Sequence, residues 1–248
     1  MSATSTTHQV RYLPAGDTGL IVEFGNEINP AVNRRVHDLA SAIRDNKVPG
    51  IIELVPTYRS LSILYDPMQQ SFADLKKALD TLLGSLKEGK IAPPKVVELP
   101  VIYGGKYGPD LDFVCQHSKL SQNEVIRIHT GAAYLVYMVG FTPGFPYLGG
   151  MDERIATPRL KTPRTTIPAG SVGIAEKQTG VYPIESPGGW QLIGYTPVKL
   201  FDPSREPPVL LEPGNFVRFV SVDEKTGKEI ESQVAQGAYK FKTYEHKP

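Results

Sequence analysis

Residues 141–203 read FTPGFPYLGGMDERIATPRLKTPRTTIPAGSVGIAEKQTGVYPIESPGGWQLIGYTPVKLFDP, and this stretch decides the fold of the second half of the chain. Nine glycines and nine prolines stand in these 63 residues, whereas the whole chain of 248 residues holds 23 and 22. Because proline fixes φ and removes a backbone donor, prolines that recur every few positions nearly exclude α-helix. Short strand-like runs such as 173–175 and 191–194 fit between the turns. The pattern predicts an all-β barrel or sandwich with long, structured loops.

The segments that flank this stretch complete the predicted barrel domain. Further strands are predicted at residues 95–103, 134–139 and 216–222. A short helical pair is predicted between the first two of them, at 111–117 and 121–130, where Ser121 and Glu124 form a capping box. We expect residues 223–248 to form a turn and a last strand, followed by a frayed tail.

The first ninety residues follow a different pattern. A strand over residues 20–24 precedes Asn29-Pro30, an N-cap followed by proline at the first helical position, and an apolar helical face runs to Ile43. Strand-like runs at 51–55 and 61–65 precede a second helix that Ser71 caps. The order strand, strand, helix, strand, strand, helix predicts an α+β domain with helices on one face of a sheet, which we interpret as a ferredoxin-like strand/helix order.

These patterns divide the chain into two predicted domains. The N-terminal α+β domain spans residues 1–92 and includes residues 1–9, which we interpret as a disordered leader. Residues 88–94 form the expected linker, and the barrel domain spans residues 93–248.

Composition excludes several classes of protein. Lys and Arg number 27 against 26 Asp and Glu, so a net charge of +1 gives no reason to expect nucleic acid or an anionic membrane as a partner. The single cysteine, Cys115, rules out an intramolecular disulfide and a cysteine-based metal site. Apolar runs are too short for a membrane span, and the first residues lack an apolar signal core. We therefore expect a cytoplasmic protein.

Familiar catalytic motifs are missing from the sequence. Gly105-Lys106 is followed by Tyr107 rather than Ser or Thr, so the phosphate-loop pattern fails. The sequence has no H-E-x-x-H, and a structural or surface role is expected for His37 and His129, which fall within predicted helices. Ser171 follows Gly170 directly, so it does not form a nucleophile elbow. We expect no metal site in this chain.

Residues 140–150, GFTPGFPYLGG, place aromatic side chains between turn residues. Proline fixes φ and glycine permits positive φ, so such a stretch can be rigid without regular structure. Two interpretations stay open. The turn buries Phe141, Phe145 and Tyr147 as core, or it forms a wall of a binding pocket or subunit interface.

The segment TPRLKTPR, residues 157–164, places three cations on a proline-stiffened chain. Arg159, Lys161 and Arg164 could hold a phosphate or a carboxylate, because an arginine binds such groups through a bidentate fork. A solvated basic loop is the alternative interpretation.

Three more loops follow, at residues 167–173, 178–183 and 186–194, and the last holds the single Trp. Their uncharged polar side chains suit the orientation of an amide substrate and are poor general acids or bases. Any proton transfer in such a pocket would need outside help. Four adjacent loops of this kind favour a pocket more strongly than any one of them.

These loops carry a resemblance to a known family. GFTPGFPYLGG, TPRLKTPR, IPAGSVGIA, QTGVYP and SPGGWQLIGYTPVKLFDP closely resemble the family of bacterial 5-oxoprolinase B subunits, which includes the kinase inhibitor KipI and was formerly called allophanate hydrolase subunit 1. Ala15-Gly16-Asp17, Val101–Gly105 and Gly108–Leu111 also match. The resemblance covers about residues 10–220.

The resemblance implies a cyclophilin-like β-barrel and a shared enzyme. Family members act with subunits C and A to open 5-oxoproline to L-glutamate at the expense of ATP, and the lactam is thought to be phosphorylated before hydrolysis. ATP is therefore a cofactor of the complex, and we expect no catalysis from this chain alone. Prolyl isomerase activity does not follow from the barrel.

The resemblance and the residue types together predict the site. The anion contacts expected to take part in catalysis are Arg159, Lys161 and Arg164. The residues expected to bind substrate are Gly144, Phe145, Ser171, Gln178, Thr179, Tyr182, Trp190 and Gln191.

A regulatory alternative stays open, because KipI-like proteins share these motifs. Such a protein binds a sporulation sensor histidine kinase and blocks its autophosphorylation. The sequence does not separate this binding module from the metabolic subunit.

Overall fold

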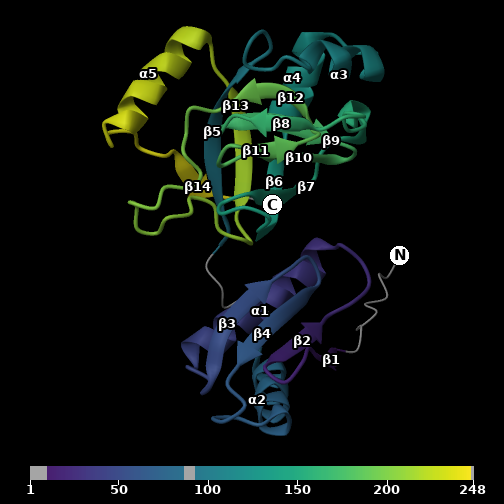
Figure 1. The fold of residues 1–248 in the computed structure, drawn as a ribbon, viewed down its shortest axis with the longest axis vertical. Coiled ribbons are helices and arrows are strands. Elements are labelled where there is room, and N and C mark those ends of the chain that lie inside the picture. The colour runs from purple at the N-terminus through teal and green to yellow at the C-terminus, as the bar shows by residue number, and fades with distance from the viewer. Residues whose placement is uncertain (1–9, 87–92, 247–248) are drawn as a thin grey trace. The chain divides into compact units, whose positions relative to one another are not determined.

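The computed structural model describes residues 10–86 and 93–246, which fall into two compact units with the division after residue 92 (Figure 1). The predicted leader, residues 1–9, and residues 88–92 of the predicted linker lie outside the described residues. Each unit has its own hydrophobic core and is described by itself.

The N-terminal unit is an antiparallel sheet with two helices. Its elements are β1 (Arg11–Pro14), β2 (Gly19–Glu23), α1 (Pro30–Asp45), β3 (Ile51–Pro56), β4 (Ser60–Tyr65) and α2 (Phe72–Ser85). The strands lie in the order β1-β2-β4-β3. The predicted α+β class is confirmed, but the ferredoxin-like order is not. A ferredoxin-like chain runs βαββαβ, whereas this unit repeats ββα, because β1 and β2 form a hairpin before the first helix.

Alternation along the strands explains why the helices cover one face of this sheet. Leu20 and Val22 of β2 and Leu61 and Ile63 of β4 point to one side and are fully buried against α1 and α2. Asn29 caps α1 as predicted, since its side chain accepts a hydrogen bond from the Ala31 N–H at 2.8 Å.

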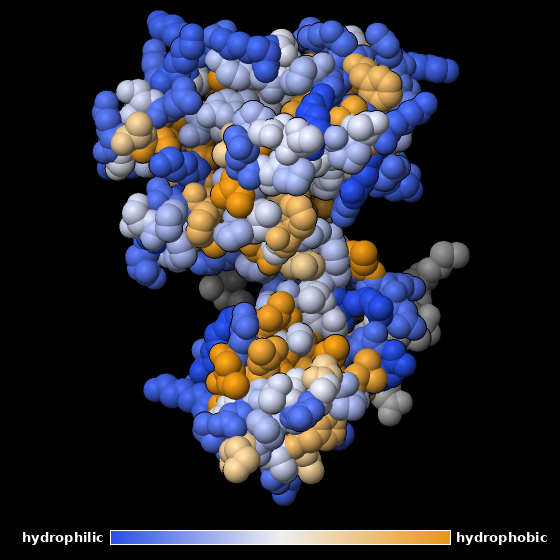
Figure 2. Space-filling model, viewed as in Figure 1, coloured by the Kyte–Doolittle hydropathy of each residue, from blue (hydrophilic) through white to orange (hydrophobic). Residues whose placement is uncertain are grey.

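The opposite face of the sheet carries exposed apolar side chains. Leu13 pairs with Ile21, Ile21 with Ser62 and Ser62 with Val55, so these four residues share one face. Leu13, Val55 and Leu64 are 37–39% exposed. Figure 2 shows apolar surface gathered on the visible side of this unit.

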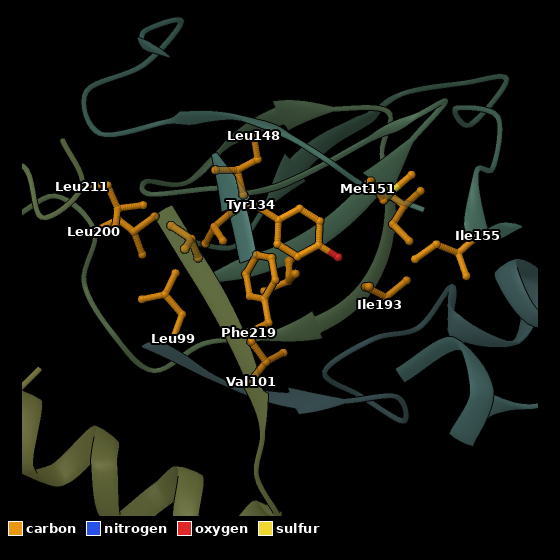
Figure 3. Close-up of a cluster of buried hydrophobic side chains, with 14 of the residues drawn as sticks. Leu99, Val101, Tyr134, Leu148, Met151, Ile155, Ile193, Leu200, Leu211 and Phe219 are labelled. Carbon is orange, nitrogen blue, oxygen red and sulfur yellow. The ribbon is translucent and has the colours of Figure 1, made fainter. Parts of the chain in front are cut away.

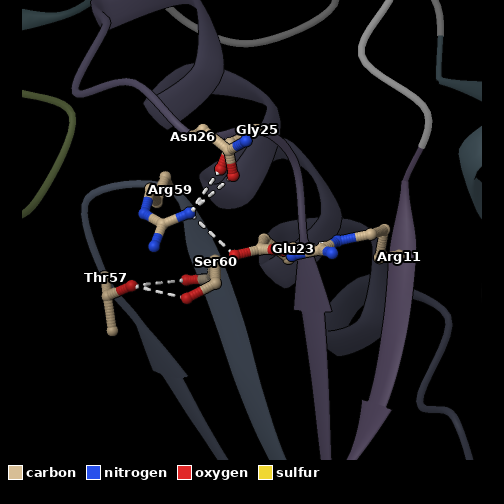
Figure 4. A network of polar contacts seen from close by, with 7 residues as sticks. All are labelled: Arg11, Glu23, Gly25, Asn26, Thr57, Arg59 and Ser60. Atoms are coloured by element: carbon tan, nitrogen blue, oxygen red, sulfur yellow. Dashed lines mark hydrogen bonds and ion pairs between the residues drawn. The ribbon is translucent and has the colours of Figure 1, made fainter.

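A network of charges ties the strands at one end of this sheet (Figure 4). The Glu23 carboxylate accepts hydrogen bonds from the Arg11 Nε at 2.7 Å and from the Arg59 Nη1 at 2.7 Å. Arg59 also donates to the Gly25 carbonyl at 2.7 Å. Hydrogen bonding from Arg11, with the charge of both guanidinium groups, holds the pKa of Glu23 below its usual value. The network fixes β1, β2 and the turn before β4 together.

The C-terminal unit has more elements. They are β5 (Lys95–Tyr103), α3 (Leu111–Ser118), α4 (Gln122–Gly131), β6 (Ala133–Val139), β7 (Pro146–Gly149), the 3-10 turn η1 (Glu153–Ile155), β8 (Arg164–Ile167), β9 (Ser171–Ala175), β10 (Gln178–Val181), β11 (Ser186–Gly188), β12 (Gln191–Tyr195), β13 (Phe216–Ser221), α5 (Glu224–Ala235) and β14 (Thr243–Glu245).

These strands form a nearly closed barrel. The main sheet runs β10-β9-β12-β5-β13-β6-β7, and β7 comes back beside β10. The strand β14 pairs with the start of β5, and β8 pairs with β11 in a separate ribbon. Inward-facing side chains fill the interior, where Tyr134 and Phe219 lie 5.4 Å apart between ring centroids (Figure 3). The predicted barrel is confirmed, and its cyclophilin-like character stays a prediction.

The unit is not all-β, because it contains three helices. The predicted pair corresponds to α3 and α4, and the Ser121–Glu124 capping box is present. The third helix, α5, corrects our expectation of a turn and a strand after Ser221. Asp223 caps it by accepting from the Thr226 N–H at 2.7 Å, and Gly227 lets it approach β5, since a Cβ there would lie 2.3 Å from the Ile102 Cδ1. The predicted last strand exists as β14.

Within residues 10–86 and 93–246, no helix is both long enough and apolar enough to cross a membrane.

Candidate functional site

A small hollow of about 160 Å³ lies among the Gly/Pro-rich loops of the barrel unit. We call it the aromatic cavity. Its lining residues are Phe141, Phe145, Tyr147, Arg159, Gln178, Tyr182, Pro187, Gly188, Gly189 and Trp190. They come from the turn between β6 and β7, from the segment before β8, from β10, and from β11 with its flanking loops.

Phe145 is the centre of the aromatic cavity. Its ring meets the rings of Tyr147, Tyr182 and Trp190 edge to face, with centroids 5.4–5.7 Å apart. Such edge-to-face pairs are the favourable geometry for aromatic rings. The preceding residue, Gly144, has φ +81°, and a Cβ there would lie 3.0 Å from the Phe201 Cβ. Glycine is therefore needed to turn the chain so that Phe145 points inward.

Tyr182 is almost fully buried and lies against Gly188. A Cβ at Gly188 would lie 2.3 Å from the Tyr182 hydroxyl, so the two strands approach closely only because this residue is glycine. Burial raises the pKa of Tyr182, although a hydrogen bond with the Trp190 backbone and the charges of Arg159 and Arg164 oppose the shift. The phenol thus stays protonated at neutral pH and can donate a hydrogen bond.

Arg159 and Gln178 supply the polar groups of the aromatic cavity. The Arg159 guanidinium carbon lies 5.9 Å from the centre of the Trp190 ring, and the residue is exposed. Gln178, the first residue of β10, is half-buried. A cation and an amide thus meet at an otherwise aromatic surface.

The segment that carries Arg159 is tied to the chain at residues 189–191. The Gln191 Nε2 donates to the Pro158 carbonyl at 2.8 Å, and the Leu160 N–H donates to the Gly189 carbonyl at 2.7 Å. Gln191 is only 2% exposed and does not line the aromatic cavity. Its role in this structure is to hold the Arg159 segment.

Arg164 belongs to the same sequence motif, but its charge is already paired. Its Nη2 donates to the Asp110 carboxylate at 2.7 Å, and its Nη1 donates to the Trp190 carbonyl at 3.4 Å. The other Asp110 oxygen accepts from the Leu192 N–H at 2.6 Å. Arg164 therefore braces the wall behind Trp190 and does not line the aromatic cavity.

Asp110 is a residue that the sequence interpretation missed. It stands at the N-cap of α3, yet its side chain makes no capping hydrogen bond because both oxygens serve Arg164 and Leu192. The available signal was the Gly108–Leu111 motif. A Cβ at Gly108 would lie 2.1 Å from the Ile193 carbonyl oxygen, which explains the glycine two positions before the aspartate.

Ser171 and Thr179 lie in the barrel wall. Ser171 in β9 is 5% exposed, and Thr179 in β10 is fully buried. The Thr179 hydroxyl donates to the Gly173 carbonyl at 3.1 Å and lies 2.7 Å from the His129 Nε2. The His129 Nδ1 lies 2.7 Å from the Tyr103 hydroxyl, so both ring nitrogens have partners inside the core. This position gives Thr179 and His129 a structural role.

Five of the predicted residues line the aromatic cavity. They are Phe145, Arg159, Gln178, Tyr182 and Trp190. The predicted residues outside the lining are Gly144, Lys161, Arg164, Ser171, Thr179 and Gln191.

The two interpretations of the 140–150 turn each hold for a different ring. Phe145 is 4% exposed and belongs to a hydrophobic cluster, whereas Phe141 is 69% exposed at the edge of the aromatic cavity. Lys161 is also exposed. Amino-acid type alone could not separate these orientations.

A second, larger hollow of about 570 Å³ lies elsewhere on the barrel unit and contains none of the predicted residues. Its lining residues are Val96, Ala133, Arg218, Tyr244, Glu245 and His246. The part of the chain that the structure describes contains no group of three or more His, Cys, Asp or Glu side chains placed to hold a metal ion.

The family with the description "Carboxyltransferase domain, subdomain C and D" matches residues 10–211, and the chain belongs to this family. Its curated relatives include the 5-oxoprolinase B subunit of Bacillus subtilis, which is 48% identical over 85% of this chain and 92% of that protein. The 5-oxoprolinase B subunit of Escherichia coli O157:H7 is 41% identical over 84% of this chain and 94% of that protein. The family resemblance that the loop motifs indicated is thus confirmed.

Solved structures are similar as well. A conserved uncharacterized protein of Pyrococcus horikoshii is 49% identical, with a TM-score of 0.52 over 87% of this chain and 99% of that chain. The urea amidolyase of K. lactis has a TM-score of 0.77 over 98% of this chain and 17% of that chain. Its 24% identity shows a common fold.

Proposed function

We propose that this chain is the B subunit of an ATP-dependent 5-oxoprolinase and that its aromatic cavity holds the 5-oxoproline ring. The observation that carries the proposal is the pairing of one exposed cation, Arg159, with one amide, Gln178, on a cavity otherwise lined by aromatic rings and turn residues. The 5-oxoprolinase relatives from B. subtilis and E. coli, which match over almost their full length, support the assignment.

The chemistry of 5-oxoproline suits these groups. Its carboxylate would bind the Arg159 guanidinium through a charge-assisted hydrogen bond, and its lactam amide would pair with the Gln178 amide. Its ring methylenes would contact Phe145 and Trp190. A cavity of about 160 Å³ is below the size usual for larger ligands and fits a small ring.

The aromatic cavity binds and orients, and it needs chemistry from outside. Its lining contains no carboxylate and no histidine, and the Tyr182 phenol is protonated. A general base must therefore come from another subunit, which supports the expectation that the chain alone is inactive. The exposed apolar sheet face of the N-terminal unit also supports a life in a complex, since such surfaces mark contact sites.

We assign ATP to the assembly with subunits A and C. Arg159 and Lys161 are the exposed cations of the TPRLKTPR segment, and their charge suits a phosphate as well as a carboxylate. The cytoplasmic location that we expected stays a prediction.

The test is reconstitution with subunits A and C, followed by measurement of ATP-dependent glutamate release. We expect Arg159→Ala to lower kcat/KM at least about tenfold, or about 1.4 kcal/mol, with an unchanged melting temperature because the side chain is exposed. The matched control is Arg154→Ala, an exposed arginine paired with Asp152 outside the aromatic cavity, which should leave kcat/KM unchanged. No glutamate release from well-folded wild-type subunits would contradict the function, and an unaltered Arg159→Ala enzyme would contradict the site.

The kinase-inhibitor role stays a second prediction. The curated relatives that match most of this chain carry the metabolic name, which favours the enzyme subunit.

A further inference from the structure

Phe141 adopts a backbone conformation that is costly for its type of side chain. Its φ is +64°, in the left-handed region that bulky residues rarely occupy. Three other non-glycine residues with positive φ occur in the described ranges, Lys47, Lys119 and Glu176, and all are flexible charged residues. Phe141 is the aromatic member of this set.

Three backbone hydrogen bonds force this conformation. The Gly140 N–H donates to the Phe145 carbonyl at 3.0 Å, the Phe145 N–H to the Thr142 carbonyl at 3.0 Å, and the Thr142 N–H to the Gly140 carbonyl at 2.8 Å. They close a tight loop with Phe141 at its bend. Asparagine or glycine would satisfy the same loop with less strain.

Burial does not compensate for the strain, because the Phe141 side chain is 69% exposed. Its ring meets Phe145 edge to face at 5.6 Å and so extends the chain of aromatic rings to the open edge of the aromatic cavity. A strained residue with an exposed ring at a cavity edge points to a role in binding.

We propose that Phe141 is a specificity-determining residue whose ring packs against the methylene edge of the bound lactam. This inference rests on the proposed function, and it adds which side chain sets the ring size that the site accepts. The charged and amide groups of the ligand would lie toward Arg159 and Gln178, and the apolar edge would remain for the aromatic rings of Phe141 and Phe145. A ring one methylene larger would meet Phe141 first.

The experiment compares two substitutions that both relieve a left-handed residue. Phe141→Asn removes the ring and keeps a side chain that tolerates positive φ. Lys119→Asn does the same at the C-cap of α3, where φ is +58° and no cavity-lining residue is involved. The ring-retaining variant Phe141→Tyr tests rescue. All are assayed in the complex with subunits A and C for the substrate KM and for inhibition by the six-membered homologue, 6-oxopiperidine-2-carboxylate.

We expect Phe141→Asn to keep or raise the melting temperature and to raise the substrate KM at least about tenfold. We also expect the ratio of the homologue's inhibition constant to this KM to fall about tenfold, the size of effect typical of one methylene in an apolar pocket. Lys119→Asn should keep the wild-type KM and ratio, and Phe141→Tyr should restore both.

Each contrary result has a separate meaning. An unchanged KM and ratio in Phe141→Asn, or a loss of folding in this variant, would overturn the role of Phe141 while wild-type activity keeps the proposed function. An inactive wild-type complex would instead contradict the proposed function itself.

Discussion

Arg159 and Arg164 stand five positions apart in one motif, TPRLKTPR, and the structure gives them different roles. Arg159 is exposed on the aromatic cavity, whereas Arg164 is paired with Asp110 in a partly buried ion pair with side chains 30% and 13% exposed. The difference arises from the Gly108–Leu111 turn, which brings a carboxylate to one arginine only. At the scale of the residue, chemistry is decided by the nearest partner.

The Arg164–Asp110 pair makes a stability prediction. We expect Arg164→Ala to lower the free energy of unfolding by about 1–3 kcal/mol, because it leaves a partly buried carboxylate without its cation. Urea unfolding of Arg164→Ala, Asp110→Asn and the double variant measures the coupling. The double variant should lose less than the sum of the two single losses. Additive losses would show that the ion pair does not brace the wall.

At the scale of the element, α5 and β14 are the parts that our sequence interpretation treated least well. The match to the carboxyltransferase family ends at residue 211, before either element begins. Both lie against β5, since β14 pairs with residues 95–97 and α5 brings Gly227 against Ile102. They therefore protect a strand that is central to the barrel.

Removing these elements should destabilise the barrel unit without touching the aromatic cavity. We expect deletion of residues 223–248 to lower the melting temperature by about 4–8 °C, because it exposes Ile102 and the edge of β5. Deletion of residues 242–248 alone removes β14 and should cost less. Differential scanning calorimetry of both variants is the measurement. A melting temperature equal to that of the full chain would show that neither element supports β5.

At the scale of the whole molecule, one buried histidine couples global stability to pH. His129 is fully buried, and desolvation lowers its pKa to about 3 from the usual value near 6.5. The unfolded chain therefore binds one more proton than the folded chain between these two values. Stability from this group is complete above pH 6.5 and is lost as the pH falls toward 3, with a slope approaching about 1.4 kcal/mol per pH unit.

The phenols beside His129 do not titrate in this range, because burial raises the pKa of both Tyr103 and Tyr134. We expect His129→Gln to unfold with a shallower pH dependence between about pH 4 and 6 than the wild type. The exposed residue His117 supplies the control, and His117→Asn should keep the wild-type slope. Urea unfolding at several pH values tests both, and equal slopes for wild type and His129→Gln would contradict a neutral buried imidazole.

The sequence by itself determined the two kinds of domain and most of their elements. Period-two and helical patterns with their caps located α1 to α4 and β5, since these signals depend on neighbours along the chain. The Gly/Pro-rich loops located the region of the aromatic cavity, because turn residues act locally.

Only the tertiary structure decided which side chains line that cavity. Thr179 points into the core toward His129, and Gln178 beside it lines the aromatic cavity, because successive side chains of a strand face opposite sides. Asp110 takes Arg164 from a turn 54 positions away, and Phe141 stands exposed because three backbone bonds close its loop. Strand register and long-range pairing set these positions, and no local pattern in the sequence encodes them.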